Sequence, residues 1–264
     1  MKTKIFLLII GLAIGTFVGL YFTQFKSVLT LKRSVKTEVD YGKENDFLSD
    51  LINGHEEFKT HYYPLHEKEF LDLVDNGQKP GAIIITCSDS RIVLDRLFST
   101  NPGQLFIVRN PGNLAPPYTI DSTQLQASVL ASVEYAVHHL GIKDVIVMGH
   151  SDCGAMNAVY SGADLSGFPG LIRWLSIDSD LFKSFQKKHQ EHPPTKKEGL
   201  FLFEKFSIVG QLHHLSHYPI LRDLLKDESI HLHGWFYDVR SGGIDYYDTD
   251  KKGFFPLSIK EIGS

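Results

Sequence analysis

Three side chains in this sequence have the chemistry of a metal site, although they lie far apart in the chain. Cys87 and Cys153 are the only two cysteines, and His150 lies three residues before the second of them. Zinc takes thiolate and imidazole ligands in tetrahedral geometry, and three protein ligands leave one position for water, as in catalytic sites. The alternative interpretation is a pair of small buried hydrophobic residues. We expect one Zn²⁺ per subunit, held by Cys87, His150 and Cys153.

A carboxylate and a guanidinium follow the first cysteine closely. Asp89 lies two residues after Cys87, where it can either ligate the metal or accept a hydrogen bond from a metal-bound hydroxide. Arg91 can hold Asp89 ionised and oriented through a bidentate pair. Metal binding lowers the pKa of water to about 7, which provides a nucleophile at neutral pH. The alternative is a solvated surface ion pair.

The elements that must position these side chains are two apolar strands. Residues 82–85 are a run of small or β-branched residues and residues 145–148 are a second apolar run, both typical of strands that are buried on both faces of a parallel sheet. The first run is followed by Cys87, and the second is followed by His150 and Cys153. Because ligands of open α/β sheets bind at the carboxyl ends of the strands, the pattern predicts an α/β fold with the site at that edge.

Length and composition limit the function classes. The 264 residues suffice for a full hydrophobic core, and 42% hydrophobic with 22% charged residues is ordinary for a globular protein. The formal net charge of -4 offers no basic field, so we expect no nucleic-acid partner. Two cysteines are too few for a disulfide framework.

The N-terminus predicts a membrane segment. Residues 5–23 carry no charge and follow two lysines, and such a helix would span the hydrocarbon core of about 30 Å. We predict a signal-anchor or transmembrane segment at 1–25, a linker at 26–45 and a folded domain at 46–264. The expected protein is membrane-anchored through this helix, with the folded domain periplasmic or otherwise extracytoplasmic. Basic residues on both flanks leave the orientation open.

The rest of the chain predicts a mainly parallel central sheet with flanking helices and an antiparallel C-terminal extension. No clear pattern marks residues 161–198. Hydrophobic periodicity, glycine turns and prolines predict two helices from Phe47 separated by Pro64, a strand at 104–109, a helix at 122–140, a helical region at 199–225 interrupted near Pro219, and a strand pair in 230–248.

The two polar strand ends also carry a family resemblance. C-S-D-S-R at 87–91 and G-H-S-D-C-G at 149–154 resemble the motifs of the β-class carbonic anhydrases. The likeness runs from about residue 45 to 250. It includes Q-L-F-I-V-R-N around Phe106, S-V-E-Y-A-V around Tyr135 and the closing L-H-G-W-F-Y-D-V-R-S-G.

The resemblance implies a zinc-dependent reversible hydration of carbon dioxide to bicarbonate and a proton, by attack of zinc-bound hydroxide. It implies that Cys87, His150 and Cys153 are the zinc ligands. Asp89 and Arg91 would form a catalytic dyad that orients the hydroxide. In a closed, inactive form, Asp89 would itself be the fourth zinc ligand, so the dyad would also gate the metal.

The resemblance further implies that Gln78, Phe106 and Tyr135 shape a small substrate pocket, in which an apolar wall suits a nonpolar gas and one amide suits the developing bicarbonate. For these three residues, core packing or a surface amide is the alternative. The N-terminal helices and the final strands resemble the family's dimerisation elements, so the chain is expected to form a homodimer or tetramer.

Two other functions fit the same residues. Hydrolysis of a CO2-like molecule such as carbon disulfide would need only a different access to the pocket. A non-catalytic, zinc-stabilised bicarbonate sensor would use the metal without turnover. The Asp89–Arg91 pair argues against the sensor, since a protein that only binds bicarbonate would not need it.

Overall fold

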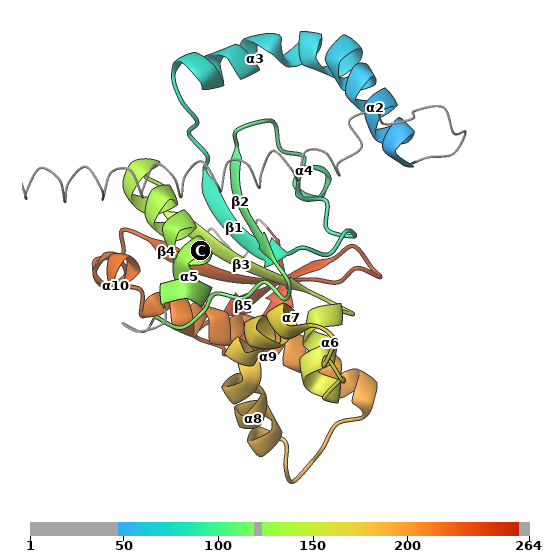
Figure 1. Ribbon diagram of the computed structural model, residues 1–264. Coiled ribbons are helices and arrows are strands. Elements are labelled where there is room, and N and C mark those ends of the chain that lie inside the picture. Colours follow the sequence, from blue (N-terminus) through green and yellow to red (C-terminus); the bar gives the residue numbers. More distant parts are fainter. Residues whose placement is uncertain (1–46, 119–122, 259–264) are drawn as a thin grey trace, which may run out of the picture. The chain divides into compact units, whose positions relative to one another are not determined.

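The computed structural model describes residues 47–118 and 123–258 (Figure 1). The chain divides into two compact units, residues 1–67 and 68–264. The predicted linker at 26–45 and the predicted segment at 1–25 lie outside the described residues, so the domain boundaries proposed from the sequence stay predictions.

The membrane-anchored localisation predicted from residues 5–23 is corrected. Within residues 47–118 and 123–258, no helix is both long enough and apolar enough to cross a bilayer. The hydrophobic segment on which the prediction relied falls outside those residues. We therefore do not retain the N-terminal hydrophobic helix as part of the fold, or the membrane as a partner.

The first described residues form helices with exposed apolar side chains. Helix α2 (Phe47–Glu57) passes through a π-helical turn, η1 (Phe58–Tyr62), into helix α3 (Tyr63–Asp75). Pro64 lies directly after the π-helical turn, in which the Tyr63 N–H donates to the carbonyl oxygen of Phe58, so the helix departs from regular α-helical bonding where proline has no N–H to contribute. No residue of these three elements is buried, and the side chains of Phe47 and Leu65 are 73% and 82% exposed.

The second unit contains a six-stranded mixed sheet with strand order β2-β1-β3-β4-β5-β6. The first four strands in this order are parallel, and β5 and β6 add antiparallel. The predicted parallel sheet with an antiparallel C-terminal extension is confirmed. The strands are β1 (Ala82–Cys87), β2 (Leu105–Asn110), β3 (Asp144–His150), β4 (His231–Tyr237), β5 (Ile244–Asp248) and β6 (Gly253–Pro256).

Helices connect these strands and flank the sheet. Two of them, α7 and α8, lie in the region where the sequence shows no clear pattern. The π-helical turn η2 continues α5 at its C-terminal end. The helical elements are α4 (Leu94–Leu97), α5 (Thr123–Glu134), η2 (Tyr135–His139), α6 (Gly154–Ser161), α7 (Pro169–Leu175), η3 (Ser176–Asp178), α8 (Ser179–Lys188), α9 (Lys196–Ser216) and α10 (Pro219–Lys226).

Two hydrophobic clusters form the core. Alternate residues of a strand point to opposite faces of the sheet, so Ile83 and Ile85 of β1 belong to one cluster and Ile84 belongs to the other. Helix α9 packs against β3 and β4 and contributes Ile208 to the first cluster and Phe203 to the second. The strands that end at the predicted site are therefore fixed from both sides.

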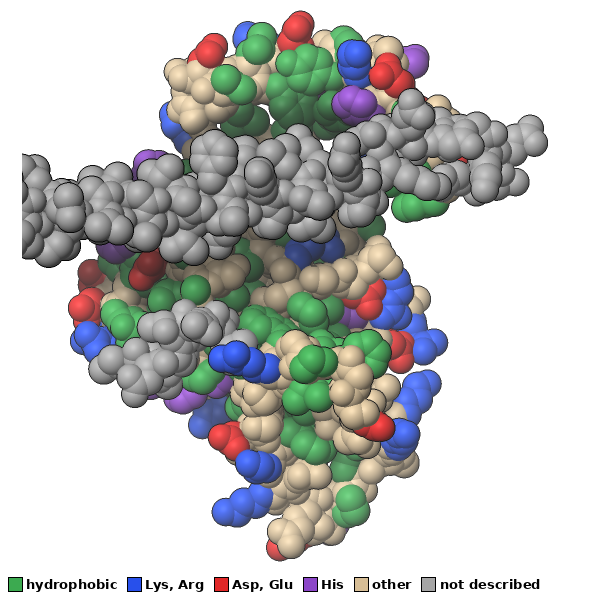
Figure 2. Space-filling view, in the orientation of Figure 1, with side chains coloured by type: hydrophobic (Ala, Val, Ile, Leu, Met, Phe, Trp, Pro, Cys, Tyr) green, Lys and Arg blue, Asp and Glu red, His purple; other side chains and the backbone are tan. Residues whose placement is uncertain are grey.

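The face of the molecule in Figure 2 is mixed in charge. Basic and acidic side chains are interspersed on the face that Figure 2 shows, together with hydrophobic and neutral groups. Charges of opposite sign that lie near one another screen each other's fields. No large region of one sign dominates this face among the residues that the figure colours.

Candidate metal centre and active site

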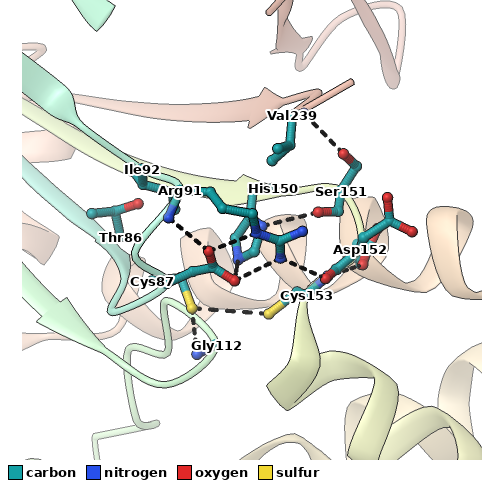
Figure 3. Close-up of polar contacts among 12 residues, drawn as sticks. Thr86, Cys87, Arg91, Ile92, Gly112, His150, Ser151, Asp152, Cys153 and Val239 are labelled. Carbon is teal, nitrogen blue, oxygen red and sulfur yellow. Dashed lines mark hydrogen bonds and ion pairs between the residues drawn. The ribbon is translucent and has the colours of Figure 1, made fainter. Parts of the chain in front are cut away.

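The three predicted ligands converge at one edge of the sheet. Cys87 ends β1 and His150 ends β3, and these strands are parallel neighbours, so both ends lie at the same edge. The turn after β3 brings Cys153 to the same place (Figure 3). The ligand atoms of the three residues all lie within 4.8 Å of one another, and all three residues are buried.

The imidazole of His150 is oriented for metal binding. Its Nδ1 lies 3.0 Å from the carbonyl oxygen of Ser151, an acceptor, so Nδ1 carries the proton. Its Nε2 is then the free lone pair. This atom is buried and has no hydrogen-bond partner among the described residues. A buried polar atom without a partner is costly, and a metal ion in front of it would remove that cost.

The two sulfurs have the spacing that tetrahedral zinc requires. Cys87 Sγ and Cys153 Sγ are 3.9 Å apart. Two thiolates at a zinc–sulfur distance of about 2.3 Å in tetrahedral geometry are separated by about 3.8 Å. The donor set of two sulfurs and one imidazole nitrogen, the sulfur spacing and the orphaned Nε2 therefore all fit a zinc ion.

The charges of the two cysteines depend on each other. The contact with Cys153, together with interactions from His150 and the Gly112 N–H, lowers the pKa of Cys87 in spite of its burial. The same contact, together with burial, raises the pKa of Cys153. Burial lowers the pKa of His150, but its interaction with Cys87 outweighs this and the net shift is upward. A divalent cation would stabilise both sulfurs as thiolates, the form that binds metal.

Asp89 and Arg91 form the predicted pair beside the ligands. Arg91 Nε donates to Asp89 Oδ1 at 2.8 Å and Arg91 Nη2 donates to Asp89 Oδ2 at 2.7 Å. This bidentate contact holds the pKa of Asp89 well below its usual range. Asp89 Oδ2 also lies 3.9 Å from His150 Nε2, so the carboxylate borders the metal position without joining the group of closely spaced ligand atoms.

The same arginine reaches the turn that carries the other two ligands. Arg91 Nη2 donates to the backbone oxygen of Asp152 at 2.9 Å. Asp152 has a left-handed backbone conformation, with φ of 56°, which is uncommon for a residue other than glycine. One side chain thus orients Asp89 and supports the turn between His150 and Cys153.

Sequence reasoning missed the side chains that fix this turn from β4. The Ser151 N–H donates to the carbonyl oxygen of Tyr237 at 3.0 Å. Ser151 Oγ donates to Asp238 Oδ1 and accepts from the Val239 N–H, each at 2.9 Å. Ser151 stands inside the histidine–cysteine motif and Asp238 inside the closing motif, but nothing in either pattern indicates that the two are in contact.

Sequence reasoning also missed a buried carboxyl group on α9. Glu204 is 3% exposed and its Oε1 accepts from the Cys153 N–H at 2.7 Å. Burial raises the pKa of Glu204 to about 7, although the hydrogen bond from Cys153 opposes this. Glu204 thus fixes the backbone of Cys153 from helix α9, which begins 43 residues after Cys153 in the chain. No local signal could have identified it.

The predicted pocket residues lie at the other end of the strands. Phe106 pairs with Ile83 near the start of β1, whereas Cys87 pairs with Asn110 at its end. At a rise of about 3.3 Å per residue, these two levels are separated by roughly 13 Å. The rings of Phe106 and Tyr135 are 5.9 Å apart, and Tyr135 and Gln78 both line a surface hollow of about 610 Å³. The structure brings these three together, but not with the ligands of the same chain.

Comparison with known proteins agrees with this geometry. A family model described as carbonic anhydrase matches residues 82–244. A carbonic anhydrase of Pseudomonas aeruginosa is 37% identical over 211 residues, which cover 80% of this chain and 92% of that protein. The structure of the beta-carbonic anhydrase CcaA matches with a TM-score of 0.73 and 29% identity, covering 80% of this chain and 92% of that one. One of two tetrameric beta-carbonic anhydrases from Sordaria macrospora matches with a TM-score of 0.61 and 29% identity, covering 77% and 97%.

The fold and the ligand set thus define a class of metalloenzyme with a Cys-His-Cys site at the carboxyl end of a parallel sheet. The chain belongs to the β-class carbonic anhydrase family, and it is an enzyme of that family. The resemblance drawn from the two motifs is confirmed. The Cys87, His150 and Cys153 group is compatible with the zinc that the family uses.

Proposed function

We propose that this enzyme hydrates carbon dioxide to bicarbonate and a proton with one zinc ion per subunit, held by Cys87, His150 and Cys153. The observation that carries the proposal is the buried ligand group, in which His150 Nε2 has no other partner and an ionised carboxylate stands beside it. When bound, zinc supplies Lewis-acid chemistry that makes water a nucleophile near neutral pH.

Asp89 orients the reacting water in this proposal. Its carboxylate is kept ionised by the two hydrogen bonds from Arg91, so it can only accept a hydrogen bond. An O–H group that donates to Asp89 keeps an oxygen lone pair turned away from the carboxylate and toward the substrate. Arg91 is fixed in turn by the Asp152 carbonyl, so the acceptor is preorganised before substrate enters.

The gate would use the same carboxylate. In the closed form, Asp89 would leave Arg91 and take the remaining ligand position, which excludes water. The arrangement described here has Asp89 on Arg91, with 3.9 Å between its Oδ2 and His150 Nε2, and so supports a form that is open to water. The same distance also supports a closed form, because the carboxylate already lies beside the ligand group.

The substrate pocket would be completed by a second copy of the chain. Gln78, Phe106 and Tyr135 are separated from the ligands of their own chain by roughly 13 Å of strand, yet Tyr135 is 44% exposed and available to a partner. The exposed apolar residues of α2 and α3 also favour self-association, because such side chains gain free energy on burial. The Sordaria macrospora relatives are described as tetrameric. We therefore propose a homodimer or tetramer with sites that each use two chains.

Stopped-flow measurement of CO2 hydration by the zinc-loaded full chain tests the proposed function. We expect fast turnover that rises between about pH 6.5 and 9, as ionisation of the water requires. An exposed substitution remote from the site, Lys183→Ala, serves as the matched control. Stoichiometric zinc binding without hydration at any pH in this range would contradict the proposal.

A further inference from the structure

One loop contacts the sulfur of Cys87 without contributing a ligand. The Gly112 N–H donates to Cys87 Sγ at 3.4 Å (Figure 3). Gly112 has a φ of 85°, and a Cβ atom at this position would lie 2.7 Å from Met156 Cε, so only glycine brings this N–H to the sulfur without strain. An N–H that points at a thiolate sulfur stabilises its negative charge and restricts its direction.

The loop is fastened to α9 by a glutamine. The Ala115 N–H donates to Gln211 Oε1 at 2.8 Å, and Gln211 is fully buried. An amide side chain can present either its oxygen or its nitrogen to a neighbour, and the two ends differ little in shape. The Ala115 N–H is satisfied only if the oxygen of Gln211 faces it, so something must determine which way the amide points.

Asp178 determines that direction. Its Oδ1 accepts from Gln211 Nε2 at 2.7 Å and its Oδ2 accepts from Ser207 Oγ at 2.6 Å. An ionised carboxylate accepts hydrogen bonds only, so it selects the nitrogen end of the amide and turns the oxygen toward Ala115. Asp178 stands at the N-cap position of α8 but makes no side-chain capping bond, so its side chain serves α9 instead of its own helix.

The charge of Asp178 has no other evident use. The residue is fully buried, and no cationic side chain of residues 47–118 and 123–258 pairs with it. Burial raises the pKa of Asp178 to about 6, although Ser207 and Gln211 oppose this shift. A buried carboxylate without a cation is costly. The role that explains a costly carboxylate here is its orientation of Gln211, which holds the loop next to Cys87.

We propose that Asp178 is a positioning residue for the Cys87 side of the metal site, acting through Gln211 on the backbone of Ala115 and thus on the Gly112 N–H. The inference rests on the proposed zinc site and assigns it a support that reaches from η3 through α9 to the loop. Asp178 touches neither ligand nor substrate. Its contribution is to keep one N–H aimed at one sulfur.

A second hydrogen bond, independent of Asp178 and Gln211, also holds this loop and limits the expected effect of replacing either residue. Trp174 Nε1 donates to the Pro111 carbonyl oxygen at 2.7 Å, which holds the same loop from α7. Loss of the Asp178 relay should loosen the loop without releasing it. Removal of outer partners of metal ligands typically costs 10–100-fold in metal affinity. Asp178 lies two contacts beyond the Gly112 N–H, through Gln211 and the backbone of Ala115, so we expect the lower end of that range, about tenfold.

The test uses the full chain loaded with Co²⁺, which takes the place of zinc and reports its ligands by absorption. Asp178→Asn and Gln211→Met should each raise the rate of Co²⁺ release to a chelator about tenfold and shift the thiolate-to-cobalt charge-transfer band. Lys205→Met is the matched control, because Lys205 lies on α9 like Gln211 but its 2.7 Å ion pair is with Asp245 of β5 and not with the loop. This control should leave the release rate and the band within twofold of wild type.

A double variant shows whether Asp178 acts through Gln211 or whether the two residues affect the metal site independently. If Asp178 acts only through Gln211, the double variant Asp178→Asn/Gln211→Met should release Co²⁺ no faster than Gln211→Met alone. Multiplication of the two single effects would overturn the inference. Circular dichroism establishes that each variant is folded, and Gln211→Met, which preserves the side chain's size, carries the comparison with wild type if Asp178→Asn does not fold.

The outcomes distinguish this inference from the proposed function. If wild-type protein shows no thiolate-to-cobalt band, the proposed metal site fails and the inference fails with it. If wild type shows the band and both Asp178→Asn and Gln211→Met release Co²⁺ at the control's rate, the metal site stands and the positioning role of Asp178 is wrong.

Discussion

The two ends of strand β1 differ in almost every physical property. At its carboxyl end, Cys87 is buried next to His150 and Cys153, and the Cys153 N–H is held by the distant Glu204. At its amino end, Phe106 of the adjacent strand and Tyr135 lie beside an open hollow, and Tyr135 is 44% exposed. At the carboxyl end, all three possible metal ligands come from one chain, whereas the amino end presents a surface.

In the proposed two-chain sites, the two ends of the parallel strands would serve different active sites. A metal site needs rigid, desolvated ligands, which the core of a single subunit provides. A substrate pocket needs apolar walls that close over the metal, and here those walls lie roughly 13 Å of strand away from it. If sites are built between copies, the carboxyl end of one β1 and the amino-end residues of another meet, and neither end works alone.

The largest expected effect is at the carboxyl end. Cys87→Ser should lose zinc, with affinity reduced more than about a hundredfold, because even the outer partners of metal ligands contribute 10–100-fold. Tyr135→Phe, at the amino end, should keep one zinc per subunit. Metal analysis of the purified variants checks both. Zinc loss in the Tyr135 variant would end the distinction between the two regions.

The next effect separates metal binding from turnover. Asp89→Asn should retain zinc and lose CO2 hydration by roughly 10²-fold or more, the usual contribution of a positioned acid–base group. The amide can still accept a hydrogen bond but no longer pairs with Arg91 as a carboxylate does. Stopped-flow rates and zinc content, measured on the same preparation, check this. Full turnover in the variant would remove the proposed dyad and gate.

Mixing variants tests whether sites use two chains. Gln78→Ala disables the amino end and Cys87→Ser disables the carboxyl end, so each alone should be nearly inactive. After unfolding and refolding together, dimers that contain one of each retain one intact site, and statistical mixing should restore roughly a quarter of wild-type turnover. Co-refolding of each variant with itself is the control. Without recovery in the mixture, Gln78 would have to act within its own chain or not at all.

The smallest expected effect concerns Asp178, the carboxyl group buried behind the loop that contacts Cys87. The pKa of Asp178 is about 6 in the folded protein and about 3.9 in an unfolded chain. Between these values the folded state binds more protons, so the contribution of Asp178 to the unfolding free energy falls as the pH rises through this window.

Asp178→Asn removes this titration. The unfolding free energy of wild type relative to the variant should therefore fall by about 1 kcal/mol from pH 5 to pH 7. Urea unfolding at the two pH values measures this difference, and titrations elsewhere in the chain cancel in the comparison. A difference that is constant with pH would show that Asp178 is not an unusual acid.

Much of the site could be predicted because its signals are local. An apolar run that ends in Cys87-Ser-Asp89-Ser-Arg91 specifies a buried strand, a ligand and an ion pair within ten residues of chain. The second run does the same for His150 and Cys153. The parallel order of β1 and β3 follows from the type of strand, and parallel neighbours place their ends at one edge.

The helices that were not predicted depend on tertiary contacts more than on local sequence. Helices α7 and α8 lie within 161–198, where no helix is predicted, although α8 has an amphipathic spacing whose apolar face includes Phe185, which is 3% exposed. Short helices are marginal by themselves, and tertiary contacts decide whether they form. The membrane helix predicted at the N-terminus falls outside the described residues, and no helix within 47–118 and 123–258 could cross a bilayer.

The sequence by itself determined the ligand types, the Asp89–Arg91 pair and the parallel sheet that brings the strand ends together. These features depend on residue chemistry and on periodicity within a few residues. Only the tertiary structure decided that Ser151 is held by Asp238, that Glu204 holds Cys153, and that Gln78, Phe106 and Tyr135 lie at the opposite end from the ligands. The physical reason is that packing against distant residues sets these positions, and no local pattern encodes which surfaces will meet.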